Sequence, residues 1–271
     1  IRLSLVGSEM CIRDRANDAT GASWGAIKYL DGDPFSHDYR GAFNSLAVVD
    51  GAPAISYRSD MYQSLRYIEA LDVAGGDWGS PQTLVDNDND VGTFTTLVSP
   101  SGAPPMICYY DATSRDLRGI GKNAAGTAWN APIYIDGSAD DVGRFASGAL
   151  VANDLAVCYF NETQADIRFA HYNMIAGDWV NVVVCDSGPI GDLSLAVIDG
   201  TPAVCYYDAA NGDLKYVRAL DAGGKNWGAV ETVDSLGNVG THASMAEVDG
   251  LAAISYCFEN HELRFALRVG P

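Results

Sequence analysis

Short apolar runs alternate with turn sequences along nearly the whole chain. Within residues 191–239, taken as one unit, the runs cover 193–199, 202–208, 213–220 and 227–234, and Val, Ile, Tyr and Ala dominate them. Asp-Gly, Asn-Gly and Gly-Gly pairs punctuate the gaps, and such pairs favour tight hairpin turns. No helical period of any length appears. The pattern predicts four antiparallel strands in each unit, joined by short turns.

The unit recurs along the chain. All five tryptophans fall at intervals of 48 to 54 residues, and an aspartate follows each of them seven or eight residues later. A glycine then opens the following unit, and SLAVVDGAPAISY at 45–57 returns in close copies at 194–208 and 244–256. The repeated positions are Trp24, Trp78, Trp129, Trp179 and Trp227; Asp31, Asp86, Asp136, Asp186 and Asp234; and Gly41, Gly92, Gly143, Gly191 and Gly240. Four strands every 50 residues or so form a propeller blade, so the sequence predicts an all-β protein, a β-propeller of five four-stranded blades.

The two ends of the chain need separate treatment. Residues 5–15 read LVGSEMCIRDR, which resembles a translated sequencing adapter, so we predict that residues 1–15 are not native and lie outside the blade pattern. Residues 16–271 are predicted to form one domain, with repeats near 41–91, 92–142, 143–190, 191–239, and 240–271 together with 16–40. Because the last unit supplies three strands, we predict that a strand near Trp24 pairs with Leu263–Arg268. This pairing would close the ring and remove exposed strand edges.

The charge balance excludes two classes of partner. The chain carries 35 acidic residues against 17 basic ones, a net charge of −18. A surface that binds nucleic acids or anionic membranes requires clustered Lys and Arg. No apolar run approaches the length of a membrane-spanning helix. We therefore expect no nucleic-acid partner and no membrane insertion. We expect a monomer that binds a glycan or protein ligand outside the cell or at the cell surface.

A resemblance to known repeats supports this expectation. The segment PAVCYYDAANGDLKYVRA at 202–219, followed by the tryptophan position, resembles repeats of secreted bacterial and archaeal propeller proteins. It resembles the fucose-specific-lectin and sialidase-like superfamilies more distantly. The hairpins at 70–78 and 219–227 lack the serine of sialidase Asp-boxes, and neither an arginine triad nor a Tyr–Glu pair can be picked out. The third-strand position where the lectins carry Glu holds Tyr67, Gly119, Phe169, Tyr216 and Phe265. The resemblance therefore implies the fold without sialidase catalysis or fucose binding.

Three repeated residue types are predicted to be structural. Cys108, Cys158 and Cys205 share one second-strand position with Ser56 and Ser255, which indicates small packing residues rather than disulfides. The tryptophans are predicted to plug the junctions between blades, with a sugar-stacking platform as the alternative. A base repeats on the third strand, as Arg66, Arg118, Arg168, Lys215 and Arg264. We predict one structural ion pair per blade with an acid such as Asp111 or Asp208; the alternative is a ring of anion-binding bases.

The candidate binding residues lie on one rim. The turns after the second and fourth strands of each blade share that rim, and most of the acidic residues fall in them. Asp86, Asp88 and Asp90 are the candidate metal ligands, for Ca²⁺, although DNDND lacks the glycine and glutamate of an EF-hand loop. One position, two residues after the opening glycine, holds the candidate ligand-binding residues Phe43, Phe94, Phe145 and His242. These should form a collar at the mouth of the central channel; alternatively they only seal the hub.

These features favour a non-catalytic extracellular binding module that recognises glycan or protein on its acidic rim. No catalytic residue can be identified. One alternative is a sialidase-like or other glycoside hydrolase-like enzyme, which would need paired carboxylates at the channel mouth. The other is a purely structural repeat domain of a larger surface protein.

Overall fold

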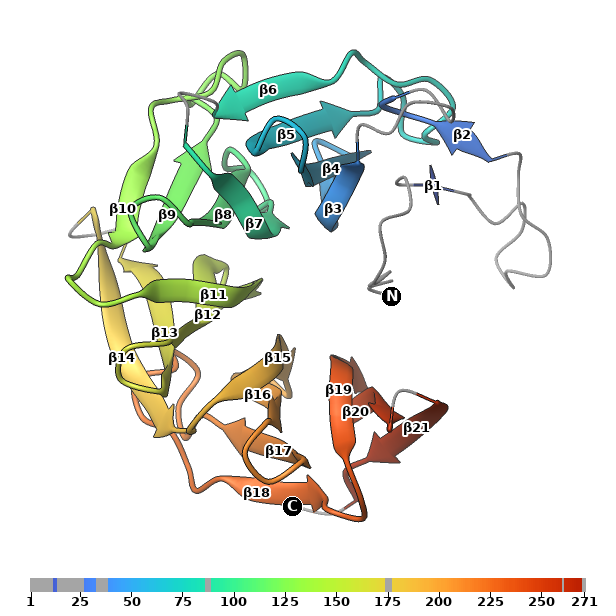
Figure 1. The fold of residues 1–271 in the computed structure, drawn as a ribbon. Helices are drawn as coiled ribbons and strands as arrows, with labels where there is room; N and C mark the ends of the chain where they lie inside the picture. Colours follow the sequence, from blue (N-terminus) through green and yellow to red (C-terminus); the bar gives the residue numbers. More distant parts are fainter. Residues whose placement is uncertain are drawn as a thin grey trace.

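Five antiparallel sheets surround a central axis (Figure 1). The computed structural model describes residues 12–13, 27–32, 39–85, 89–173, 177–259 and 261–269. The first sheet contains β3 (Arg40–Val49), β4 (Ala52–Ser59), β5 (Ser64–Glu69) and β6 (Gln82–Val85). The second contains β7 (Val91–Val98), β8 (Met106–Asp111), β9 (Asp116–Gly121) and β10 (Ile133–Asp136). The third contains β11 (Val142–Val151), β12 (Asp154–Asn161), β13 (Asp166–Asn173) and β14 (Asp178–Asp186).

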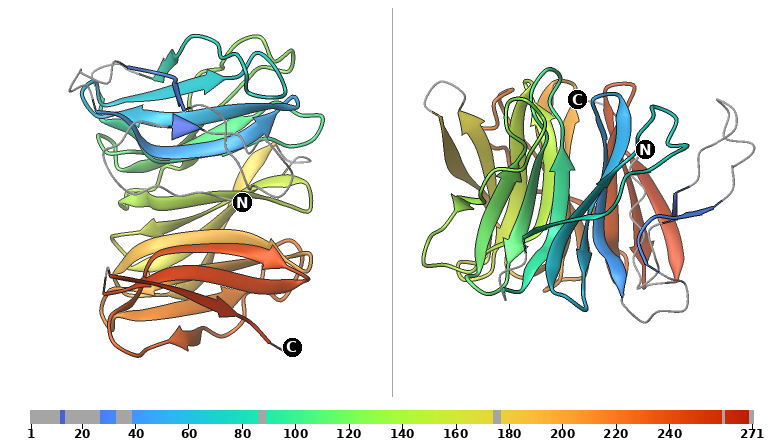
Figure 2. Two further views of the ribbon diagram at one scale, coloured as in Figure 1. Left: turned by 90° about the vertical axis from the view of Figure 1, so that its right-hand side faces the viewer. Right: turned by 90° about the horizontal axis from the view of Figure 1, so that it is seen from above.

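The fourth sheet contains β15 (Ile190–Ile198), β16 (Thr201–Asp208), β17 (Asp213–Arg218) and β18 (Glu231–Asp234). The fifth contains β19 (Val239–Val248), β20 (Leu251–Phe258) and β21 (Glu262–Leu267). The first strand of each sheet lies nearest the axis and the sheets pack face to face (Figures 1 and 2). No helix occurs in the described part of the chain, so none there could cross a membrane. The predicted all-β fold, a five-bladed propeller, is confirmed.

The repeated Asp-Gly pairs make the inner hairpins. Val49 pairs with Ala52 across a two-residue loop, in which Asp50 and Gly51 have φ of 50° and 83°. Asp199–Gly200 and Asp249–Gly250 repeat this geometry. Positive φ at both central residues defines a type I′ turn, whose twist matches that of the flanking strands. The turn residues therefore set the register of the two inner strands.

The hydrophobic core lies between blades rather than within one. Tyr67 of the first sheet clusters with Ile107 and Tyr109 of the second, and Phe169 of the third with Val204 and Tyr206 of the fourth. Five of these six residues are fully buried, and the sixth, Tyr206, is 3% exposed. Because each sheet buries one face against its neighbour, the ring is held together by the junctions.

A hydrogen bond also joins the inner strands at each described junction. A hydroxyl on one inner strand accepts from a backbone N–H on the next, as Leu97→Ser45, Gly148→Thr96, Leu195→Ser147 and Met245→Ser194, at 3.0, 3.0, 3.0 and 3.1 Å. Ser244 is the corresponding residue of the fifth blade. Leu46, the first-blade counterpart of Leu195, is 48% exposed, whereas Leu195 is 3% exposed. The four junctions between consecutive blades therefore repeat one arrangement, and no such bond joins the fifth blade to the first among the described residues.

The closing strand differs from the prediction in the part that can be followed. β21 pairs with β20, and the fifth sheet has three strands among the described residues. β2 (Lys28–Tyr29) pairs with β1 (Ile12–Arg13), and no pairing with β21 occurs among the described residues. Trp24 lies outside the described residues. The β1–β2 pair belongs to none of the five blades, and the adapter origin of residues 1–15 stays a prediction.

Candidate functional site

The predicted collar is built by a repeated bulge at the start of the inner strands. Phe43, Phe94, Phe145 and His242 have φ of 51°, 52°, 54° and 56°, and the strand register shifts around each of them. A bulge redirects a side chain, and positive φ is unfavourable for a bulky residue. The glycine before each bulge is required as well: a Cβ on Gly143 would lie 2.9 Å from the Leu117 Cα of the preceding blade.

The three phenylalanines form one continuous aromatic ridge. The ring of Phe94 lies 4.9 Å from that of Phe43 and 4.9 Å from that of Phe145, centroid to centroid. Tyr110 and Phe160 flank the ridge at 6.3 and 6.4 Å. Phe43, at one end, is 42% exposed. The structure therefore brings together three of the four predicted collar residues, over the first three blades.

The fourth predicted residue, His242, lies next to a carboxylate that the sequence reasoning missed. The His242 backbone N–H donates to Asp192 Oδ2 at 2.8 Å, and His242 Nδ1 lies 3.9 Å from the same oxygen. Burial raises the pKa of Asp192 above its ordinary value, and the contacts with His242 only partly oppose this. The signal was present: Asp192 directly follows Gly191, so it immediately precedes the collar position, which Leu193 holds in this blade.

A second polar group flanks the ridge between the second and third blades. Arg144 Nη2 lies 3.5 Å from Asp141 Oδ2, and its guanidinium lies 5.5 Å from the centre of the Tyr110 ring. The Tyr110 hydroxyl donates to Asp141 Oδ1 at 2.8 Å. Asp192, His242 and Arg144 thus place hydrogen-bonding groups around the rim that carries the aromatic ridge.

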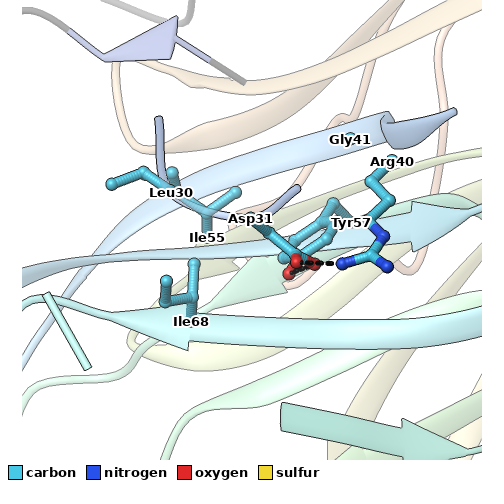
Figure 3. Close-up of a pocket in the computed structure, with 7 residues that line it drawn as sticks. All are labelled: Leu30, Asp31, Arg40, Gly41, Ile55, Tyr57 and Ile68. Carbon is cyan, nitrogen blue, oxygen red and sulfur yellow. Dashed lines mark hydrogen bonds and ion pairs between the residues drawn. The ribbon is translucent and has the colours of Figure 1, made fainter. Parts of the chain in front are cut away.

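The repeated bases are held in ion pairs, both with acids on their own hairpins, as predicted, and with acids from the preceding segment. Asp136, at the end of β10, accepts from the Tyr159 hydroxyl at 2.7 Å and from Arg168 Nη1 at 3.3 Å, both in the next blade. The triads Asp31–Tyr57–Arg66 and Asp234–Tyr256–Arg264 repeat this contact (Figure 3 shows Asp31 and Tyr57). Four of the bases also pair with an acid on their own hairpin, as predicted: Arg118 with Asp111 at 3.3 Å, Arg168 with Asp166 at 3.0 Å, Lys215 with Asp208 at 3.9 Å and with Asp213 at 2.7 Å, and Arg264 with Glu262 at 3.9 Å. In these triads the arginines are already paired with carboxylates, which argues against a ring of free anion-binding sites.

Figure 3 shows the residues that surround Asp31 and Tyr57 of the first triad. The cavity beside Asp31 and Tyr57 has a volume of only about 10 Å³, at the lower limit for one water molecule. Burial opposes ionisation of Asp31, but hydrogen bonds from Tyr57 and Arg40 and the charge of Arg66 hold its pKa below the ordinary value. This cavity is a packed junction rather than a ligand pocket.

The predicted calcium site is described only in part. Asp86 and Asp88 lie outside the described residues. Asp90 Oδ1 accepts from Arg58 Nη1 at 2.6 Å, and Gln63 approaches its other oxygen at 3.4 Å. No group of three or more His, Cys, Asp or Glu side chains suited to a metal ion occurs where the structure describes the chain. Calcium binding at residues 86–90 stays a prediction.

Trp129 and Trp227 pack at blade junctions, as predicted, whereas Trp78 packs against its own sheet and Leu30. Trp129 packs edge-on against Tyr67 of the preceding blade at 4.9 Å, and Trp227 against Phe169 at 5.5 Å. Both indoles are partly buried. Cys108, Cys158 and Cys205 are free and fully buried in this core. These side chains fill the junctions and leave the collar as the aromatic surface on the rim.

Comparison with known proteins supports the fold and stops there. No protein-family model and no curated protein matches the sequence. A protein of unknown function from Dyadobacter fermentans is similar in structure, with 11% identity, a TM-score of 0.65, and coverage of 84% of this chain and 78% of that one. The intramolecular trans-sialidase of Ruminococcus gnavus gives 10%, 0.55, 80% and 76%. The exo-β-1,3-galactanase of Phanerochaete chrysosporium gives 8% identity and a TM-score of 0.54, and the match covers 80% of this chain and 56% of the galactanase. At 8 to 11% identity these likenesses show the fold alone, a β-propeller.

Proposed function

We propose that this protein is a non-catalytic, extracellular glycan-binding module whose ligand lies on the rim formed by the aromatic ridge. The observation that carries the proposal is the strained backbone shared by Phe43, Phe94 and Phe145. Backbone strain of this kind persists where the surrounding structure enforces it, and it concentrates at ligand-binding sites. Here the repeated bulge directs three adjacent rings to one rim.

The chemistry of the rim suits a sugar. An apolar surface with a few placed polar groups is the usual composition of a small-ligand site. The ridge supplies flat apolar rings for the C–H face of a pyranose, and Arg144, Asp192 and His242 supply donors and acceptors for its hydroxyl groups. The glycan-related functions of the structural neighbours support this choice of ligand class.

The test is a glycan array followed by calorimetry on the best ligand. Phe94→Ala removes the central ring of the ridge and should weaken binding at least tenfold. Phe265→Ala is the matched control, because Phe265 is 66% exposed on β21 and lies outside the collar position. A wild-type protein that binds no glycan, or a Phe94→Ala variant that binds like Phe265→Ala, would refute the proposal.

One observation favours a second candidate function, a glycoside hydrolase. The raised pKa of Asp192 is the property that a general acid needs. Hydrolysis of aryl glycosides that Asp192→Asn abolishes while folding is retained would establish this activity and replace the binding module. Absence of turnover across a panel of aryl glycosides would leave the binding proposal standing.

A further inference from the structure

A cleft of about 660 Å³ lies between the fourth and fifth blades, on the rim opposite the collar. Its lining includes Asp199, Arg218, Glu231 and Arg268, with Leu220 and Leu251 among the apolar walls. The volume falls in the range of small-molecule sites. Two guanidinium groups on one cleft are notable in a chain with a net charge of −18.

The repeat shows what normally occupies this place. At the junction of the first two blades, Lys122 Nζ lies 2.6 Å from Glu69 Oε2, and the Tyr67 hydroxyl donates to the same oxygen at 2.5 Å. Lys122 also lies 5.0 Å from the centre of the Tyr67 ring. One carboxylate therefore joins a base and a tyrosine across that junction.

The same positions at the cleft hold no carboxylate. Arg218 stands where Glu69 does, Arg268 where Lys122 does, and Tyr216 where Tyr67 does. The Arg268 guanidinium lies 5.1 Å from the Tyr216 ring, which matches the Lys122–Tyr67 contact. The Tyr216 hydroxyl is buried and has no acceptor for its proton among the described residues. The junction thus keeps the base and the tyrosine but replaces the carboxylate with a second base.

Both arginines are positioned but only weakly neutralised. Arg218 donates to Thr201 Oγ1 at 2.6 Å and to the Ile198 carbonyl at 2.7 Å, and its nearest carboxylate, Asp199, lies 3.9 Å away and is 80% exposed. Arg268 pairs with Glu231 at 2.8 Å, and both side chains are partly exposed. Exposed ion pairs contribute little, so an anionic group can compete with Glu231.

We propose that this cleft binds a small organic ligand through a carboxylate that takes the place of the Glu69 carboxylate. The carboxylate would accept from Arg218 and Arg268, which both line the cleft, since guanidinium groups match carboxylates in geometry. A bare anion would leave most of the volume empty, whereas a sugar acid can also cover the walls at Leu220 and Leu251. The ligand class is therefore a sugar acid of monosaccharide to disaccharide size.

Ligand-observed NMR titration of the full chain with glucuronate tests the proposal. Glucose is the matched neutral ligand and acetate the matched anion without a ring, and both should bind at least tenfold more weakly. Arg268→Gln and Arg218→Gln should each weaken glucuronate binding at least tenfold, about 1.4 kcal/mol. Lys122→Gln, the same position at the closed junction, should leave it unchanged.

Thermal unfolding of each variant separates loss of binding from loss of folding. Arg268→Gln gives the cleaner result, since it removes one partly exposed ion pair and leaves the Arg218 contacts in place. Equal binding of glucuronate and glucose, or an unchanged affinity in folded Arg268→Gln, would overturn the proposal. Binding that appears only in the Trp24→Ala variant would overturn the proposal too, because the result would mean that Trp24 fills the cleft in the wild-type protein.

Discussion

The contact between Asp136 and the third blade allows a quantitative prediction. Asp136 is 7% exposed and accepts a hydrogen bond from the hydroxyl of Tyr159, which is fully buried. Asp136→Ala leaves that hydroxyl without an acceptor, which costs about 1–3 kcal/mol. Arg168 keeps Asp166 at 3.0 Å and Asp140 at 3.4 Å, so losing its third contact adds about 1 kcal/mol. We expect a total loss of roughly 2–4 kcal/mol in the free energy of unfolding.

Urea unfolding at neutral pH measures this loss. The midpoint should fall while the denaturant slope stays constant, because the surface exposed on unfolding is unchanged. At roughly 2–4 °C per kcal/mol for a chain of this size, the melting temperature should drop by about 4–16 °C.

Asp186→Ala is the matched control. Asp186 holds the same repeat position but is exposed, and in the next blade Tyr206 contacts Cys185 while Lys215 pairs with Asp213 at 2.7 Å. We expect a change of at most about 0.5 kcal/mol for this variant. Equal losses for the two variants would show that the aspartate position matters for another reason, and the interblade account would be wrong.

Three further predictions concern stability. Burial opposes the ionisation of Asp234, but hydrogen bonds hold the pKa of Asp234, like that of Asp31, below its ordinary value. The ionised carboxylates therefore stabilise the fold above about pH 4, and this stability is lost as the pH falls through the folded pKa. Asp234→Asn should make the free energy of unfolding, measured in urea, less dependent on pH in this acid range. Trp227→Ala opens the junction beside Phe169 and should cost about 3–5 kcal/mol in the same assay; less than about 1 kcal/mol would contradict the packing role. Ca²⁺ at millimolar levels or below should raise the melting temperature at fixed ionic strength if residues 86–90 bind it, and equal effects of Na⁺ and Mg²⁺ would exclude the site.

The repeated elements of the fold could be predicted because they depend on local chemistry. The Asp-Gly pairs specify type I′ turns, and the apolar runs specify strands, so four strands per unit follow from the sequence. The packing of Trp129 and Trp227 and the burial of the cysteines followed from their fixed position in each unit. The collar position could be predicted for the same reason, although Leu193 was missed because it lacks a ring.

The contacts between units could not be predicted in the same way. The base Arg168 has acids nearby in sequence, and only the packing of two sheets shows that Asp136, 32 positions earlier, lies against it. The Arg218–Arg268 cleft appears only when equivalent positions of neighbouring blades are compared in space, because neither arginine belongs to a motif.

The buried cysteines allow the opening of three individual blades to be measured. Cys108, Cys158 and Cys205 hold one position in three consecutive blades, and burial raises the pKa of Cys108 and of Cys205 to about 12. Since the thiolate is the reactive form, each sulfur can be alkylated only when its own blade opens to solvent. Timed alkylation followed by peptide mass mapping would therefore give three opening rates from one native sample. Their order would reveal whether the ring loosens from one end or separates as a whole.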